Sequence, residues 1–176
     1  KVLYCSNNVS GDVTIKDGTK SIYNDVFNNY TYSSNITSVT IPDSVVRIGD
    51  YAFSHCNNLK SVKMSSNIEY IGNYAFNMCS NMGSVDLGNK LTFLGEGAFN
   101  SCSSMKNVTI PSGVKEIYSD TFSGCSQLTN VTLNEGLEII GSYSFSYTKS
   151  LESIKMPSTV EKIDYEAFAE SGIKNV

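Results

Sequence analysis

Residues 48–64 read IGDYAFSHCNNLKSVKM, and most of the chain is a repetition of this passage. An aliphatic residue stands five positions before the phenylalanine in every copy, and the phenylalanine itself recurs at intervals of 23 residues. The recurring rings are Phe53, Phe76, Phe99, Phe122, Phe145 and Phe168. A fixed period in this range is typical of a solenoid of stacked coils.

Each repeat predicts two short extended segments joined by bends. The first, for example residues 107–110, alternates polar and apolar side chains and is expected to pair with its equivalents in one main sheet. The second, for example residues 45–48, is usually followed by glycine, and the segment up to the phenylalanine is short enough for about one helical turn. We therefore predict an α/β repeat solenoid of mostly short β-strands with about seven coils of 23 residues.

The phenylalanine column predicts a continuous spine, because rings one coil apart can stack with centroids about 5 Å apart. Residues 1–10 fit the period poorly and read as an N-terminal remnant or partial coil, whereas residues 11–176 form a single solenoid domain. A longer first interval predicts a bulge at residues 28–35. Residues 174–176 stop within an expected strand, so we expect the chain to be a fragment of a longer protein.

The charge balance argues against some partners. Thirteen basic and 17 acidic residues give a net charge of −4 without a basic cluster, which disfavours nucleic acid. No apolar run is long enough to insert into a membrane.

The repeat resembles a known family. Its consensus, Ile-Pro-x-x-Val-x-x-Ile-Gly-x-x-Ala-Phe-x-x-Cys-x-x-Leu-x-x-Val, is clearest at residues 41–62 and 110–131 and is similar to the BspA-like class of leucine-rich repeats. Tyr118 and Asp164 depart from it at the glycine position. The resemblance implies a right-handed leucine-rich-repeat superhelix at the cell surface or outside the cell. It also implies an adhesin role, since several members bind host or microbial proteins.

The residues make no positive case for an enzyme or a cofactor. His55 and Cys56 are adjacent, so their side chains are expected to diverge, and the acidic residues form no close pair. A second periodic column contains Cys56, Cys79, Cys102 and Cys125. It lacks the C-x-x-C pairs of metal sites and accepts Thr148 in the same position, so buried thiols are favoured over a disulfide ladder.

Two surfaces are candidate binding sites. The first is an aromatic set at outward positions of three consecutive coils, with the alternative that these rings only cover the rim of the stack: Tyr51, Tyr70, Tyr74 and Phe93. The second is the outward face of the main sheet, which is small and polar: Lys63, Asp86, Asn107, Thr109, Asn130, Thr132 and Lys155.

These features predict a cofactor-free module that binds a protein partner over many coils, such as a host extracellular-matrix or microbial surface protein. Two alternatives stay open, namely an architectural spacer and a carbohydrate- or cell-wall-binding module. End-to-end self-association is also expected to be possible, because terminal coils without caps expose unpaired strand edges.

Overall fold

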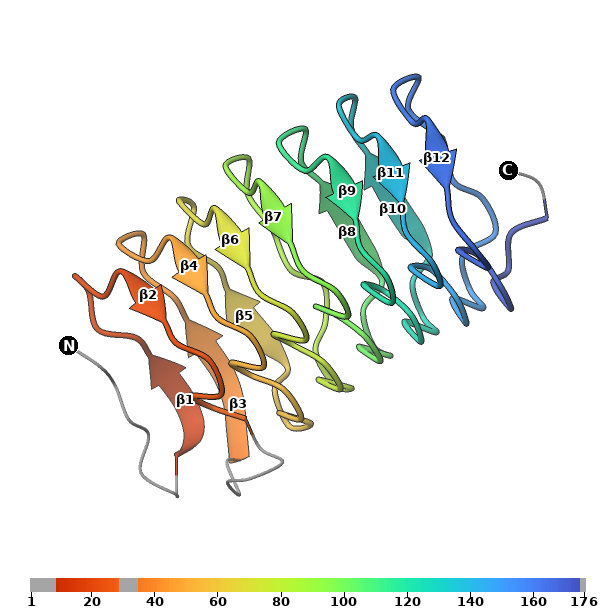
Figure 1. The fold of residues 1–176 in the computed structure, drawn as a ribbon. Helices are drawn as coiled ribbons and strands as arrows, with labels where there is room; N and C mark the ends of the chain where they lie inside the picture. The colour runs from red at the N-terminus through yellow and green to blue at the C-terminus, as the bar shows by residue number, and fades with distance from the viewer. Residues whose placement is uncertain (1–8, 29–34, 175–176) are drawn as a thin grey trace.

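A computed structural model describes residues 9–28 and 35–174 of the chain. The coils stack side by side into an elongated solenoid (Figure 1). The described residues contain twelve short strands and no helix. The β-rich repeat solenoid is confirmed, whereas the helical turn expected in each coil is wrong. Most of the predicted bulge at 28–35, Cys5, and most of residues 1–10 and 174–176 lie outside the described residues.

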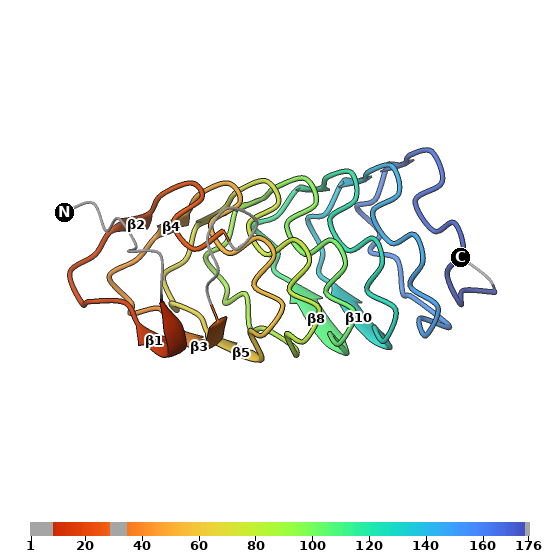
Figure 2. The same cartoon turned by 90° about the horizontal axis from the view of Figure 1, so that it is seen from below.

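The strands form two series on opposite sides of the stack (Figure 2). The first series is β1 (Ser10–Thr14), β3 (Asn35–Thr40), β5 (Ser61–Lys63), β8 (Asn107–Ile110) and β10 (Asn130–Leu133). The second is β2 (Ser21–Ile22), β4 (Arg47–Ile48), β6 (Tyr70–Ile71), β7 (Phe93–Leu94), β9 (Glu116–Ile117), β11 (Ile139–Ile140) and β12 (Lys162–Ile163). The second series has seven strands, one in each coil, and these enclose about six complete turns.

All strand pairs are parallel, because the chain runs in the same direction in each coil. Equivalent positions of neighbouring coils face each other: Ile48 pairs with Ile71, and Val108 with Val131. Columns of like residues in the sequence therefore become columns in space. In β8, for example, Val108 and Ile110 are buried while Asn107 and Thr109 are exposed.

The phenylalanine spine is confirmed. From Phe27 to Phe168, neighbouring rings stack with centroids 5.0–5.7 Å apart and planes within 13° of parallel. Phe53 to Phe145 are fully buried. Backbone hydrogen bonds run along the same axis as the ring stack: the Phe53 N–H donates to Ala75 O in the next coil at 2.8 Å.

The backbone conformation and the inter-coil hydrogen bonds of the turn explain why no helical turn forms. Two positions of each coil adopt the left-handed conformation, as at Tyr51 (φ 54°) and His55 (φ 59°). A right-handed helical turn does not accommodate such residues. Alternate N–H groups, such as those of Phe53 and His55, donate to the neighbouring coil, and those between them, such as that of Ser54, form only isolated turn bonds within the segment.

A column of glycines lets the coils approach closely next to the second series. A Cβ added at Gly72 would lie 2.7 Å from Asp50 N and from Gly49 C, which are backbone atoms of the preceding coil. Gly49 and Gly95 have the same close contacts. Tyr118 occupies this column in the coil of β9.

The second strand series is interrupted at the coil of Tyr118, and the first series at the coil before it. The second series divides into a sheet ordered β2-β4-β6-β7 and one ordered β12-β11-β9, and the first into β1-β3-β5 and β10-β8. Residues 84–87, at the missing step of the first series, form no strand. The predicted continuous main sheet is therefore wrong. Asp164 occupies the same position in the last coil, and β12 still pairs with β11 there, so the loss of glycine at Tyr118 does not by itself account for the interruption.

The turn side of the solenoid stays continuous across this interruption. The Gly97 N–H donates to Ser119 O and the Phe99 N–H to Thr121 O, each at 2.9 Å. The Phe99–Phe122 spacing of 5.7 Å is the widest in the described spine. We call the parts on either side the N-terminal block, ending with β7, and the C-terminal block, beginning with β8.

Candidate binding surface

The structure divides the predicted aromatic set between two separate stacks. Tyr70 and Phe93, at the outward positions of β6 and β7, stack with centroids 4.5 Å apart and planes 7° apart. The stack continues at one end to Tyr118, whose ring is 5.3 Å from that of Phe93 and tilted by 43°. At the other end the Arg47 guanidinium carbon lies 3.5 Å from the centroid of Tyr70. We call Arg47, Tyr70, Phe93 and Tyr118 the aromatic column.

Tyr51 and Tyr74 form the second stack, in the turns that follow β4 and β6. Their centroids are 5.2 Å apart, and Tyr51 is 40% exposed. The Tyr74 hydroxyl donates to Glu96 Oε1 at 2.6 Å, and this bond and partial burial raise the pKa of Tyr74. Gly97 makes room for the ring, since a Cβ there would collide with it. Within residues 9–28 and 35–174, no ring contact joins this pair to the aromatic column.

The sequence-based prediction did not include two members of the aromatic column, Arg47 and Tyr118. Arg47 occupies the same repeat position as Tyr70 and Phe93, so its place in the column could have been read from the period. Tyr118 stands two positions further on in its repeat, where it departs from the glycine pattern. Partial burial and the nearby Glu116 carboxylate raise the pKa of Tyr118.

The predicted sheet face is only partly brought together. Asp86, Asn107 and Thr109 line a shallow recess of about 400 Å³ where the first series is interrupted. The Asn107 backbone N–H donates to Ser84 Oγ at 3.0 Å. Asn130 is next to this recess, because its Nδ2 donates to Asn107 Oδ1 at 2.8 Å.

The remaining predicted sheet-face residues are exposed outside the recess. Lys63 and Thr132 lie in different sheets, in β5 and β10 respectively. Lys155 follows a stretch that forms no strand. The first-series face is therefore less continuous than the sequence pattern predicts.

The cysteine column is buried beneath the turns. Each thiol donates to the carbonyl of a spine phenylalanine in the preceding coil, at 3.1–3.2 Å, from Cys56, Cys79, Cys102 and Cys125. Burial raises the pKa of Cys125 to about 12. The Cys56 thiol is directed at Phe27 O. The described residues contain no His/Cys/Asp/Glu group that could hold a metal ion.

We expect the four column cysteines to resist alkylation in the folded protein. The measurement is iodoacetamide labelling at pH 8 followed by mass spectrometry, in a Cys5→Ser variant so that only the column is counted. Burial should keep native labelling at least tenfold slower than labelling in urea, because the reactive thiolate is disfavoured. Equal rates with and without urea would contradict the buried column.

Stacked 23-residue coils with columns of outward side chains define a repeat protein with an extended surface. The family model of the BspA type leucine rich repeat region matches residues 3–125 and 47–174, with six copies, so the chain belongs to this family. Membership indicates a protein-interaction scaffold of a typically non-catalytic kind. No curated protein matches the chain. The described part of the chain has no helix, and therefore none that could cross a membrane.

Solved structures of bacterial leucine-rich repeat proteins have the same fold. A leucine rich cell surface protein from Faecalibacterium prausnitzii A2-165 is 29% identical, with a TM-score of 0.80 over 95% of this chain and 50% of that one. A leucine-rich repeat protein from Bacteroides ovatus is 26% identical, with a TM-score of 0.79 over 94% and 50%. The pneumococcal vaccine antigen PcpA is 25% identical, with a TM-score of 0.50 over 81% and 44%. The chain thus spans about half the length of these proteins or less.

Proposed function

We propose that the chain is a non-catalytic protein-binding module of a secreted or cell-surface protein and that it adheres to host or microbial surface proteins. The family and its scaffold support protein binding. The description of the Faecalibacterium relative as a cell surface protein supports the location.

The observation that carries the proposal is the stacking in the aromatic column. Tyr70 has Arg47 over one face and Phe93 against the other, and Phe93 lies between Tyr70 and Tyr118. Their faces are thus directed along the stack and their edges away from it. A sugar ring packs its C–H groups on an open aromatic face, whereas apolar side chains of a protein can pack on ring edges. The column therefore favours a protein partner over a glycan.

The test is binding of the purified chain to immobilised extracellular-matrix proteins and, in parallel, to a glycan array, at physiological salt. We expect saturable protein binding that the double variant Tyr70→Ser/Phe93→Ser weakens about tenfold or more, as for central aromatic anchors. The matched control is Tyr51→Ser/Tyr74→Ser, which removes two stacked rings from the other stack and is expected to change binding less than threefold. Circular dichroism and melting curves verify that both variants fold.

Each other result would point to a different function or surface. If the chain binds neither the matrix proteins nor the glycan array, the spacer would be favoured. Binding to glycans alone would favour a carbohydrate-binding function. Protein binding that survives both double variants would exclude the aromatic set and direct attention to the recess, through Asp86→Lys and Thr109→Lys. Light scattering of the same samples would detect end-to-end association.

A further inference from the structure

We propose that the aromatic column recognises an extended peptide segment that carries a carboxylate. In this assignment Arg47 pairs with the carboxylate, and Tyr70, Phe93 and Tyr118 receive the apolar side chains that follow it. The inference rests on the proposed protein-binding function and specifies the chemistry of the partner.

Arg47 is exposed, and its stacking on Tyr70 orients its guanidinium group for binding an anion. Its guanidinium lies 3.5 Å over the Tyr70 ring, which leaves the N–H donors at its edge directed away from the ring. Within the part of the chain that the structure describes, no carboxylate is within ion-pair distance of it. A planar guanidinium with uncommitted N–H groups is suited to bind a carboxylate with two parallel hydrogen bonds.

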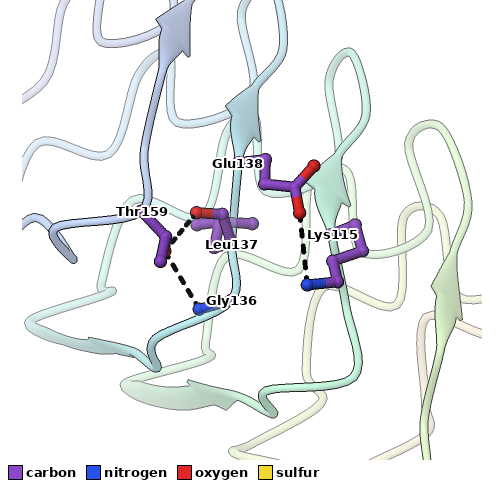
Figure 3. Close-up of polar contacts among 5 residues, drawn as sticks. All are labelled: Lys115, Gly136, Leu137, Glu138 and Thr159. Carbon is purple, nitrogen blue, oxygen red and sulfur yellow. Dashed lines mark hydrogen bonds and ion pairs between the residues drawn. The ribbon is translucent and has the colours of Figure 1, made fainter.

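Two other outward cations of the second-series side are already paired with carboxylates. Lys115 Nζ lies 3.2 Å from Glu138 Oε1 in the next coil (Figure 3). Lys162 Nζ lies 2.8 Å from Asp164 Oδ1. Figure 3 also shows how polar side chains join adjacent coils here, with Thr159 Oγ1 accepting from the Gly136 N–H and donating to Leu137 O. Arg47 differs from these lysines in having an aromatic partner in place of a carboxylate.

The column is rigid enough to act as one site. Arg47, Tyr70 and Phe93 project from β4, β6 and β7, whose backbones pair in register. Each side chain is also stacked on its neighbour, so little rotamer freedom remains to be lost on binding. The rings are half-buried, which leaves their outer edges accessible to a partner.

The column also sets a length and a direction for the peptide. Three coil steps of about 4.8 Å separate Arg47 from the coil of Tyr118, roughly 14 Å, which an extended chain spans with about four residues. Glu116 lies beside Tyr118 at the far end and would repel a second carboxylate there. We therefore expect one acidic residue at the Arg47 end, followed within about four residues by apolar side chains.

The test is selection of displayed random 10-residue peptides on the immobilised chain. Wild type is expected to enrich peptides with Asp or Glu within about four residues of apolar side chains, and changing that acid to Asn or Gln should weaken a selected peptide about tenfold or more. Arg47→Gln should lose the acid preference and weaken binding similarly, while Arg47→Glu should favour Lys or Arg instead. Lys115→Gln is the matched control, since it removes a paired cation from the same side, and it should leave binding within twofold.

The outcomes separate this inference from the function beneath it. If peptides are enriched without an acid preference, or if Arg47→Gln binds the acidic peptides as wild type does, the assignment to Arg47 is wrong while protein binding stands. If nothing is enriched and no matrix protein binds, both proposals fail. If matrix proteins bind but no peptide is enriched, the extended-peptide assignment alone is overturned. Circular dichroism of every Arg47 variant excludes loss of fold as the cause.

Discussion

Replacing Phe99 by alanine is expected to lower the free energy of unfolding by about 3–5 kcal/mol. Phe99 is fully buried in the middle of the spine, with Phe76 at 5.4 Å and Phe122 at 5.7 Å. Alanine would leave a cavity between two rings that are held in place by their own coils. The loss should therefore include both the transfer of the ring from water and the unfilled volume.

Urea unfolding followed by circular dichroism measures this loss. Phe168→Ala is the internal control, because Phe168 belongs to the same column but is half-buried, and among the described residues its ring stacks only on Phe145, at 5.5 Å. We expect the control to lose less than half as much stability. An unchanged midpoint for Phe99→Ala would refute the structural role of the spine.

Gly72→Ala is expected to destabilise the protein by about 3 kcal/mol, at the upper end for overpacking, although it adds one methyl group. The new Cβ would lie 2.7 Å from two backbone atoms of the preceding coil, Asp50 N and Gly49 C. Backbone atoms in a hydrogen-bonded coil cannot turn aside as a flexible side chain can. Relief would therefore require separating the coils.

Gly83→Ala is the matched control for this prediction. A Cβ at Gly83 would meet only Lys60 O, at an ordinary contact distance of 3.7 Å. Its effect should lie within about 0.5 kcal/mol of zero, as for an unremarkable surface change. If both alanine variants melt at the same temperature as wild type, close coil approach at the glycine column does not limit stability.

The period made the solenoid and its spine predictable from the sequence. With a constant interval and parallel coils, Phe53, Phe76 and Phe99 must occupy one column, so their stacking follows from their numbers. The path of the chain between columns was not predictable in the same way. The prediction of a helical turn was wrong because two positions of the turn, those of Tyr51 and His55, adopt positive φ. In the other coils glycine occupies these positions only at Gly97 and Gly124, so the sequence gives little sign of this conformation.

The interruption of the sheets also needed three-dimensional information. Tyr118 was visible as a departure from the glycine pattern, but Asp164 is a departure at the same position without an interruption, so the pattern alone does not predict where pairing stops. The members of the aromatic set are half-buried or exposed. Its division into two stacks depends on the turn between Tyr70 and Tyr74, which a repeat pattern does not describe.

The two blocks have a mechanical consequence. In a linear array each coil is stabilised mainly by its two neighbours, so a junction with fewer contacts is where the array yields first. At the coil of Tyr118, β8 and β9 pair with the following coil but not with the preceding one, while the turn side keeps its rings and hydrogen bonds across the step. The solenoid can thus bend at this step, with the stacked turns acting as the hinge. Bending at this step would change the fit of a partner that is long enough to contact both blocks.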